Sequence, residues 1–280
     1  MKVISTEYSQ VLGAKVAERL GTSVVDVQFS RFPDGEQYLR AGPVDREMVI
    51  IGSVVNSRAL IQLLLLIDAC NGSDICLVLP YMGYARQDKQ FREGEPLSAR
   101  AIATALAGGS SRVITVNIHD ERVLEHFRIP AVNVSLGHDI GGELKKTLDN
   151  PFIVAPDDGA GYFAEQIALA GNWDFDHLDK TRISGDTVKI AAKNLDVKGR
   201  DVVIVDDIIS TGGTIATAAS MMYGEGAKAI HTACVHGIFT GGAYTHLKSA
   251  GIRNIICSDT IERASSTISA SGVIAHAVRQ

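Results

Sequence analysis

The sequence predicts an α/β protein whose mainly parallel sheets are covered by helices on both faces. Along its 280 residues, short runs that are apolar throughout alternate with amphipathic stretches of helical length. Strands without polar positions are typical of parallel sheets, because both faces of such a sheet are buried. The length suits one large domain or two of roughly 140 residues each.

Periodicity and stop signals place the elements. In residues 7–20 the apolar side chains recur on one helical face, and Gly21 gives a stop. The run at 59–70 is a strongly apolar helix ended by Asn71 and Gly72. We expect further helices at 97–107, 163–170 and 214–223, and strands at 1–5, 48–52, 75–80, 113–118, 152–156, 202–205, 229–239 and 254–257.

The two halves of the chain resemble one another. ICLVLP and VITVNIHD in the first half are echoed by FIVAP and VVIVDDII in the second, each with a polar loop between them. We therefore predict a duplication, with domains at 1–140 and 141–280 joined by a glycine-rich link at 137–142.

Composition excludes several classes of protein. A net charge of −5 disfavours nucleic acid as the main partner, since phosphate backbones are bound by basic surfaces. The N-terminal MKVISTEYSQ lacks the apolar core of a signal peptide, and the apolar stretch 59–67 is too short to span a bilayer. From these two observations we expect a cytoplasmic protein without membrane partners. The four cysteines are widely spaced, which predicts reduced, buried thiols.

The segment VVIVDDIISTGGT at 202–214 carries the clearest chemical signal. A buried strand delivers Asp206 and Asp207 to a turn rich in glycine and hydroxyl groups, after which a helix begins. Glycine lets backbone N–H groups converge on an anion, and a helix N-terminus favours negative charge. The carboxylates suit sugar hydroxyls or a metal, so the segment predicts a sugar-phosphate site. The turn consists of Ser210, Thr211, Gly212, Gly213 and Thr214.

This segment resembles the phosphoribosyl-diphosphate motif that type I phosphoribosyltransferases share with ribose-phosphate pyrophosphokinases. The rest of the chain is similar to the pyrophosphokinases, and because it lacks the longer basic flap of bacterial members it resembles an archaeal-type one. The further motifs occur in the family's order: FPDGE (32–36), YARQDKQ (84–90), NIHD (117–120), APDDGA (155–160) and LDKTR (178–182).

The resemblance implies two similar phosphoribosyltransferase-like domains. The first would bind ATP and form the assembly, and the second would bind ribose 5-phosphate. It also implies transfer of the β,γ-pyrophosphoryl group of MgATP to the 1-hydroxyl of the sugar, giving 5-phosphoribosyl 1-diphosphate and AMP. A homodimer or larger homo-oligomer, with the ATP site shared between subunits, is implied as well.

Site residues follow from the resemblance, motif by motif. The implied ATP contacts are Phe32, Asp34, Gly35, Glu36, Arg86, Gln87 and His119. The implied ribose-5-phosphate contacts are Arg182, Asp206, Asp207, Ser210, Thr211, Gly212, Gly213 and Thr214. Magnesium would be held by His119 and Asp157. Lys180 and Arg182 would act in catalysis from a hairpin flap at 173–192 that turns at Ser184, Gly185 and Asp186.

Other interpretations stay open. A type I phosphoribosyltransferase would share the sugar-phosphate segment, but it would leave the motifs of the first half without a purpose. A non-catalytic regulatory relative would be expected to lose catalytic residues, which are present here. Taken alone, FPDGE is a common turn sequence, and a single histidine after a strand, such as His119, is more often structural. The pattern G-x-G-x-x-A at 159–164 matches a dinucleotide fingerprint, which the preceding Asp157 and Asp158 disfavour.

Overall fold

The protein is described here from a computed structural model, which covers residues 1–182, 188–191 and 195–280, with side chains described outside 179–194. The predicted turn at Ser184, Gly185 and Asp186 lies outside the described residues. The chain forms two compact units. Unit 1 comprises residues 1–135, 259–262 and 269–280, and unit 2 comprises 136–258 and 263–268.

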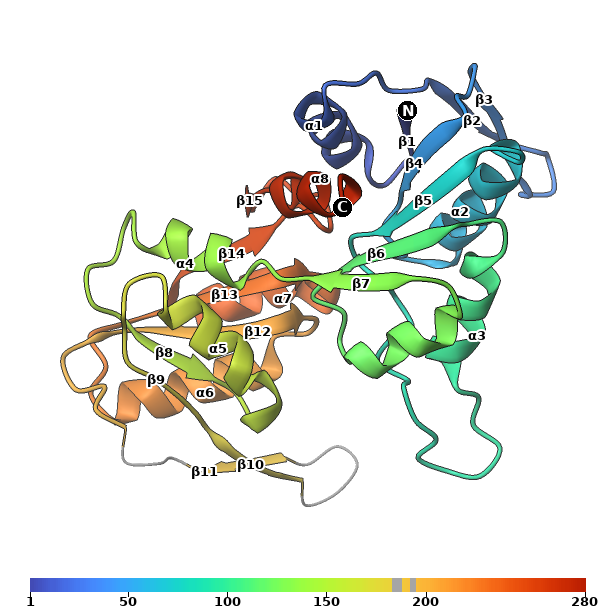
Figure 1. Cartoon of the computed structure of the whole chain (residues 1–280). Helices are drawn as coiled ribbons and strands as arrows, with labels where there is room; N and C mark the ends of the chain where they lie inside the picture. The colour runs from blue at the N-terminus through green and yellow to red at the C-terminus, as the bar shows by residue number, and fades with distance from the viewer. Residues whose placement is uncertain (183–187, 192–194) are drawn as a thin grey trace. The chain divides into compact units, whose positions relative to one another are not determined.

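Unit 1 contains a five-stranded parallel sheet in the order β1-β4-β5-β6-β7. Helices α2 and α3 lie on one face, and α1 and α8 lie on the other (Figure 1). The strands are β1 (Lys2–Ser5), β4 (Glu47–Ile51), β5 (Asp74–Leu79), β6 (Arg112–Val116) and β7 (Ala131–Val134). The helices are α1 (Gln10–Leu20), α2 (Ser57–Ala69), α3 (Ser98–Ala107) and α8 (Ser271–Val278), with the 3-10 helix η1 at Glu121–Phe127.

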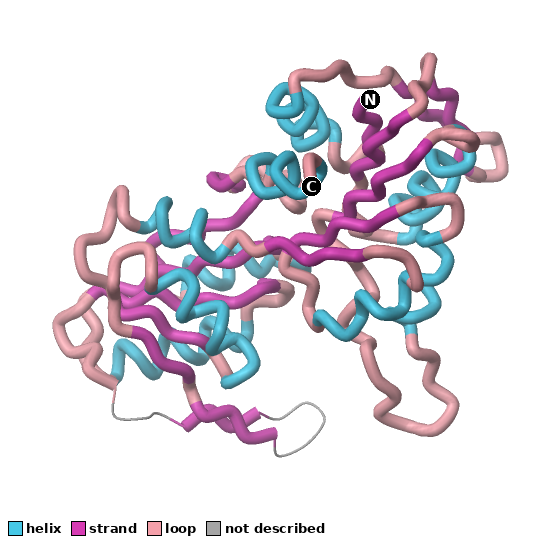
Figure 2. Tube along the Cα trace, viewed as in Figure 1, coloured by secondary structure: helices cyan, strands magenta, loops and turns pink. Residues whose placement is uncertain are grey.

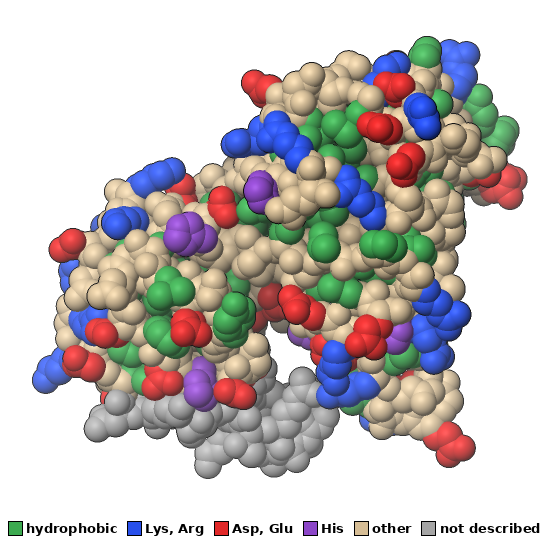
Figure 3. Space-filling view, in the orientation of Figure 1, with side chains coloured by type: hydrophobic (Ala, Val, Ile, Leu, Met, Phe, Trp, Pro, Cys, Tyr) green, Lys and Arg blue, Asp and Glu red, His purple; other side chains and the backbone are tan. Residues whose placement is uncertain are grey.

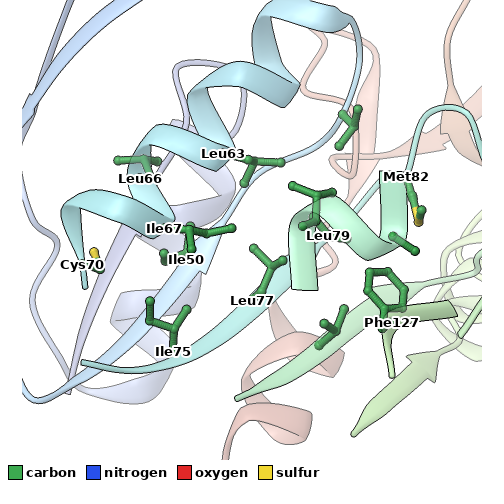
Figure 4. Close-up of a cluster of buried hydrophobic side chains, with 14 of the residues drawn as sticks. Ile50, Leu63, Leu66, Ile67, Cys70, Ile75, Leu77, Leu79, Met82 and Phe127 are labelled. Carbon is green, nitrogen blue, oxygen red and sulfur yellow. The ribbon is translucent and has the colours of Figure 1, made fainter. Parts of the chain in front are cut away.

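The core of unit 1 lies between α2 and the sheet. Leu63, Leu66 and Ile67 of α2 point toward Ile50 and Leu77 of the strands (Figure 4), and all five side chains are buried. Burial of such a side chain stabilises the fold by about 1.5–3 kcal/mol. The apolar run that predicted this helix is therefore explained by packing against the sheet.

Unit 2 contains a six-stranded parallel sheet in the order β15-β14-β13-β12-β8-β9. Its central strand β12 is longer than predicted, because Asp206 and Asp207 continue the strand instead of ending it. The strands are β8 (Phe152–Ala155), β9 (Phe175–His177), β12 (Asp201–Ile209), β13 (Ala229–Gly237), β14 (Ile252–Ser258) and β15 (Ser266–Ile268). The helices are α4 (Gly137–Leu144), α5 (Gly161–Ala168), α6 (Gly213–Gly224) and α7 (Ala243–Ser249), with the 3-10 helices η2 (Asp158–Ala160) and η3 (Thr240–Gly242).

The predicted duplication is present, but the strands that correspond in the two units are not the predicted ones. In each unit the first strand is followed by a helix and an antiparallel hairpin, and the next strand then pairs with the first (Figure 2). The strand order makes β8 the counterpart of β1 and β12 the counterpart of β4. The sequence echo had instead matched FIVAP with ICLVLP, which is β5. The hairpins are β2 (Val27–Arg31) with β3 (Gln37–Ala41), and β10 (Asp179–Arg182) with β11 (Val188–Ala191).

The compact units divide the chain differently from the predicted 1–140 and 141–280. Helix α8, at the C-terminal end of the chain, belongs to unit 1, and α4, which follows the last strand of unit 1, belongs to unit 2. The helix that follows the last strand of each unit thus belongs to the other unit. In unit 1, α8 packs on α1, and in unit 2, α4 packs on α5. A boundary drawn at one point of the sequence misses this exchange.

Polar contacts fix the C-terminal segments within unit 1. The Arg19 Nε donates to Ser271 Oγ at 2.8 Å, and Lys15 Nζ lies 2.7 Å from Asp259 Oδ2. The Glu262 carboxylate accepts from the backbone N–H of Leu12 at 2.7 Å, in the first turn of α1. A carboxylate at this position satisfies N–H groups that an α-helix leaves unpaired.

The predicted link at 137–142 is helix α4. Its Ile140 and Leu144 are buried, and a Cβ on Gly141 would lie 2.4 Å from the Cβ of Ala170. Glycine therefore permits close helix packing at this position, which the sequence predicted only as a link between domains. The change of unit does lie close by, between residues 135 and 136.

Charged side chains of both signs lie on the face of the molecule that Figure 3 shows. On the face shown in Figure 3, acidic and basic side chains are interspersed, in keeping with the net charge of −5. Within the described ranges, no helix is both long and apolar enough to cross a membrane. All four cysteines are buried and none is in a disulfide bond, as predicted.

Candidate functional site

The predicted sugar-phosphate loop connects β12 to α6 in unit 2. Gly212 stands at the N-cap of α6 with φ 79°, in the left-handed region that favours glycine. Leu247 of α7 packs against this turn, because a Cβ on Gly212 would lie 3.0 Å from Leu247 Cδ2. The turn thus opens the helix N-terminus, where the first N–H groups lack intrahelical partners and favour an anion.

Three carboxylates lie near this loop. Asp206 and Asp207 belong to β12, and Asp157 directly follows the neighbouring strand β8 and Pro156. The register pairs Ile204 with Val154, so both strands bring their carboxyl ends to one edge of the sheet. Ligands of open parallel sheets bind at this edge. The structure therefore brings the predicted acidic residues of unit 2 together with the predicted phosphate loop.

The electrostatics of this group are unusual. Burial raises the pKa of the Asp206 carboxyl well above its usual range, and the neighbouring charges of Asp207 and Asp157 raise it further. The Asp207 backbone N–H donates to Asp206 Oδ1 at 2.9 Å and partly offsets the effect. A cation or the hydroxyl groups of a sugar would stabilise the ionised form. Carboxyls with such perturbed pKa values are typical of functional sites.

Asp157 begins a short turn that leads into α5. A Cβ on Gly159 would lie 3.2 Å from Asp157 Oδ1, so glycine leaves room for this carboxylate. The next residue, Asp158, is almost fully exposed, and its Oδ1 lies 3.8 Å from Nε2 of His177 in β9. The other ring nitrogen of His177 lies 3.3 Å from Asp176 Oδ1. His177 was not among the residues predicted for the site.

In unit 1 the FPDGE segment forms the tip of the β2–β3 hairpin. The backbone N–H of Phe32 donates to the carbonyl of Glu36 at 2.9 Å, and Gly35 adopts φ 96°. The Phe32 side chain is 50% exposed, with its ring 5.7 Å from that of Tyr38 in an edge-on arrangement. The tip therefore presents an aromatic face beside the acidic side chains of the motif.

The other predicted ATP residues lie in two loops that a single arginine joins. Arg122 Nη2 lies 3.5 Å from Asp88 Oδ2 in the loop that carries Arg86 and Gln87. The same guanidinium group donates to Asp120, which directly follows His119. The Arg122 guanidinium lowers the pKa of Asp120 to about 2. The structure thus brings the YARQDKQ and NIHD loops together.

Arg122 was missed because its contact with Asp88 joins two loops that are distant in sequence. Only its position three residues after His119 could have suggested it. Both Arg86 and His119 have exposed side chains at the carboxyl ends of β5 and β6. This placement is the unit 1 counterpart of the sheet edge that carries the acidic residues of unit 2.

The flap residues fall partly outside the description. Lys180 and Arg182 lie on β10, where Lys180 pairs with Ile190 and Arg182 pairs with Val188 of β11. The predicted extended arms are thus an antiparallel hairpin. The side chains of Lys180 and Arg182 are not among the described ones, so the catalytic assignment of these residues stays a prediction.

The predicted metal ligands belong to different units, Asp157 to unit 2 and His119 to unit 1. Among the residues described, no three or more His, Cys, Asp or Glu side chains form a group that could hold a metal ion. Magnesium prefers oxygen ligands and commonly takes one or two carboxylates beside substrate phosphates and water. The carboxylates of Asp157, Asp206 and Asp207 fit that chemistry, and the pairing with His119 stays a prediction.

Comparisons with known proteins match two domain families to the two parts of the chain. Residues 1–108 match the N-terminal domain of ribose phosphate pyrophosphokinase, and residues 136–268 match the phosphoribosyl transferase domain. The chain is 48% identical to a ribose-phosphate pyrophosphokinase of Methanosarcina acetivorans, over 100% of both chains. It is 40% identical to ribose-phosphate pyrophosphokinase 2 of Archaeoglobus fulgidus, over 98% of this chain and 99% of that one.

A solved structure gives the same result for the fold. The phosphoribosylpyrophosphate synthetase of Mycobacterium smegmatis superposes with a TM-score of 0.86 at 28% identity, covering 99% of this chain and 97% of that one. The matches to these relatives cover both halves of the chain. The chain belongs to the ribose-phosphate pyrophosphokinase family.

Proposed function

We propose that the protein transfers the β,γ-pyrophosphoryl group of ATP to the 1-hydroxyl of ribose 5-phosphate, producing 5-phosphoribosyl 1-diphosphate and AMP. One observation carries the proposal. The carboxylates and the phosphate loop of unit 2 occur in a chain whose first half has the nucleotide motifs of a pyrophosphokinase. A phosphoribosyltransferase would need only the second set.

Unit 2 binds the sugar phosphate in this proposal. The backbone N–H groups and hydroxyls of Ser210–Thr214 hold the 5-phosphate at the N-terminus of α6. Asp206 and Asp207 accept hydrogen bonds from the ring hydroxyls. The raised pKa of Asp206 supports this role, because bound hydroxyl donors would stabilise the carboxylate that burial disfavours.

Unit 1 binds ATP. Arg86 and Gln87 contact the nucleotide, with the guanidinium of Arg86 suited to phosphate oxygens. Phe32 provides an exposed ring for base stacking, and Asp34, Gly35 and Glu36 surround it at the hairpin tip. A magnesium ion, when bound, would neutralise phosphate charge and polarise the transferred group. Asp157 and His119 are its proposed protein ligands.

The transfer needs positioning and charge stabilisation more than covalent chemistry. The 1-oxygen of the sugar attacks the β-phosphorus, the bond from that phosphorus to the α,β-bridging oxygen breaks, and AMP leaves with this oxygen. The proton of the 1-hydroxyl passes to water. Lys180 and Arg182 stabilise the negative charge that grows on the bridging oxygen and on the transferred group.

We also propose that the enzyme is a homo-oligomer in which the 32–36 tip completes the ATP site of a neighbouring subunit. The exposed Phe32 at the end of a hairpin supports this arrangement. Light scattering combined with size exclusion tests the assembly. A monomer that retains full activity would exclude the shared site.

The function is tested by incubating the protein with ATP, Mg²⁺ and ribose 5-phosphate. We expect equal amounts of AMP and of a sugar product heavier by one diphosphate, measured by mass spectrometry. AMP without the sugar product would indicate ATP hydrolysis. No AMP, together with diphosphate release from 5-phosphoribosyl 1-diphosphate and a purine base, would favour a phosphoribosyltransferase. No reaction in either assay would favour the regulatory relative.

A further inference from the structure

A segment outside the predicted site lies directly beside the phosphate loop. The chain from Gly237 to Thr240 begins at the last residue of β13. The backbone N–H groups of Ile238 and Phe239 donate to the carbonyl of Ile209 at 3.0 and 3.1 Å. The Thr240 N–H donates to the carbonyl of Ser210 at 3.1 Å. The hydroxyl groups of Ser210 and Thr240 lie 3.3 Å apart. Residues 238–240 thus hold the first residue of the phosphate loop.

Arg263 binds the other edge of the same segment. Its Nε donates to the carbonyl of Gly237 at 2.7 Å, and its Nη2 donates to the carbonyl of Ile238. β14 ends at Ser258, so these carbonyls lie beyond the strand that pairs with β13. Two N–H groups of the guanidinium fork thus donate to two successive backbone carbonyls. The backbone N–H groups of a paired strand or a second loop would otherwise fill this role.

The conformation of the segment needs such support. Phe239 has φ 49° and ψ 49°, in the left-handed region that costs a residue with a side chain about 1–2 kcal/mol. Its ring lies over Gly237, where a Cβ would be 2.5 Å from Phe239 Cε2. Strained residues persist where the surroundings over-determine them, and they cluster at functional sites. The support here comes from the hydrogen bonds to the carbonyls of Ile209 and Ser210, and from Arg263.

We infer that Arg263 is a positioning residue for ribose 5-phosphate, acting through the segment 237–240 on the hydroxyl of Ser210. This inference rests on the proposed function of the 210–214 loop. Arg263 itself touches neither Ser210 nor the loop in the contacts above. Its effect passes through the carbonyls of Gly237 and Ile238 to Thr240, whose hydroxyl orients that of Ser210 toward the phosphate.

Four variants test the inference. In Arg263→Met the fork is lost, and because the side chain is exposed no cavity is left. In Arg263→Lys the charge stays but only one carbonyl can be bound well. Thr240→Val removes the hydroxyl at constant shape. Arg253→Met, an exposed arginine near the start of β14, is the matched control.

We expect Arg263→Met to raise the KM for ribose 5-phosphate by about five- to thirty-fold, less than the loss of a direct hydrogen bond to a charged group. The kcat and the KM for ATP should stay within about two-fold, since the transferred group is not contacted. Arg263→Lys should lie between Met and wild type. The double variant with Thr240→Val should resemble the worse single variant, because both act on one path.

A readout without substrate separates this inference from the proposed function. Amide hydrogen exchange of residues 237–240 should be faster in Arg263→Met and unchanged in Arg253→Met. Wild type that forms no AMP with ribose 5-phosphate would refute the proposed function, whatever the exchange shows. Normal wild-type turnover with an unchanged sugar KM in Arg263→Met, or a fully active Arg263→Lys, would overturn the inference. If the Met variant does not fold, the Lys and Val variants decide by the same KM criterion.

Discussion

Gly212 offers a quantitative test of the phosphate loop. Its φ of 79° would cost alanine about 1–2 kcal/mol. A new Cβ would lie 3.0 Å from both Cγ and Cδ2 of Leu247, and overpacking of this kind costs about 1–3 kcal/mol. We therefore predict that Gly212→Ala lowers the free energy of unfolding by about 2–4 kcal/mol, and lowers the Tm by roughly 5–15 °C.

Gly213 is the matched control for stability. It directly follows Gly212 as the first residue of α6, and its added Cβ would meet nothing within 4 Å. Gly213→Ala should leave the Tm unchanged or raise the free energy of unfolding by about 0.4–1 kcal/mol, because alanine reduces the entropy of the unfolded chain. Calorimetry of the ligand-free proteins measures both changes.

A third variant separates the two costs. In a Leu247→Ala background the Cβ contact disappears, so Gly212→Ala should then cost only the backbone part, about 1–2 kcal/mol. Equal Tm values for Gly212→Ala and Gly213→Ala would refute the left-handed turn and its packing against α7. An undiminished cost in the Leu247→Ala background would refute the contact alone.

Three further predictions address the flap, the acidic cluster and α4. Lys180→Ala should lower kcat by about 10²–10⁴ while ribose 5-phosphate binding changes little, and steady-state kinetics with a near-normal kcat would remove Lys180 from the catalytic role. Because the folded state raises the pKa of Asp206, it holds a proton that the unfolded chain releases at lower pH, so the ligand-free protein should lose stability as pH rises from 3.8 through the raised pKa. Asp206→Asn should reduce this slope in urea unfolding while raising the KM for ribose 5-phosphate, and an unchanged slope and KM would refute the assignment. Gly141→Ala should cost about 1–3 kcal/mol because its Cβ would lie 2.5 Å from the carbonyl oxygen of Ile167, whereas Gly142→Ala, with open space around it, should cost nothing by calorimetry.

The strands and long helices were predictable because burial dictates their sequence. Runs such as 48–52 and 75–80 became β4 and β5 within one residue at each end. In these strands the apolar side chains face helices on both sides of the sheet, so the pattern has one physical solution. The same holds for α6, in which Ile215, Ala218, Ala219 and Met222 are all buried.

The β2–β3 hairpin was missed although its signal was present. Residues 27–31 and 37–41 flank FPDGE with an alternation of half-buried and exposed positions, which is the period of a strand. The five-residue turn was recognised as a nucleotide motif, and its flanks were left unassigned. Here a functional interpretation displaced a structural one.

The remaining differences depend on tertiary contacts. The exchange of α4 and α8 between units is invisible to local patterning, because either helix could cover either sheet. The glycines of α4 look like a link between domains until the close approach of Ile167 and Ala170 to Gly141 is known. Arg263 acts through the carbonyls of Gly237 and Ile238, which are distant in sequence, so no motif could have identified it. Arg122 contacts the nearby Asp120, but its contact with Asp88 depends on the fold.

The transfer of the pyrophosphoryl group is tested by following one oxygen atom. ATP labelled with ¹⁸O in the α,β-bridging position is incubated with Mg²⁺, ribose 5-phosphate and the enzyme, and the products are analysed by mass spectrometry. Attack on the β-phosphorus predicts that the label appears in AMP and that the diphosphate of the sugar product carries none. Label in the sugar product, or a sugar left unmodified while ATP is consumed, would contradict it.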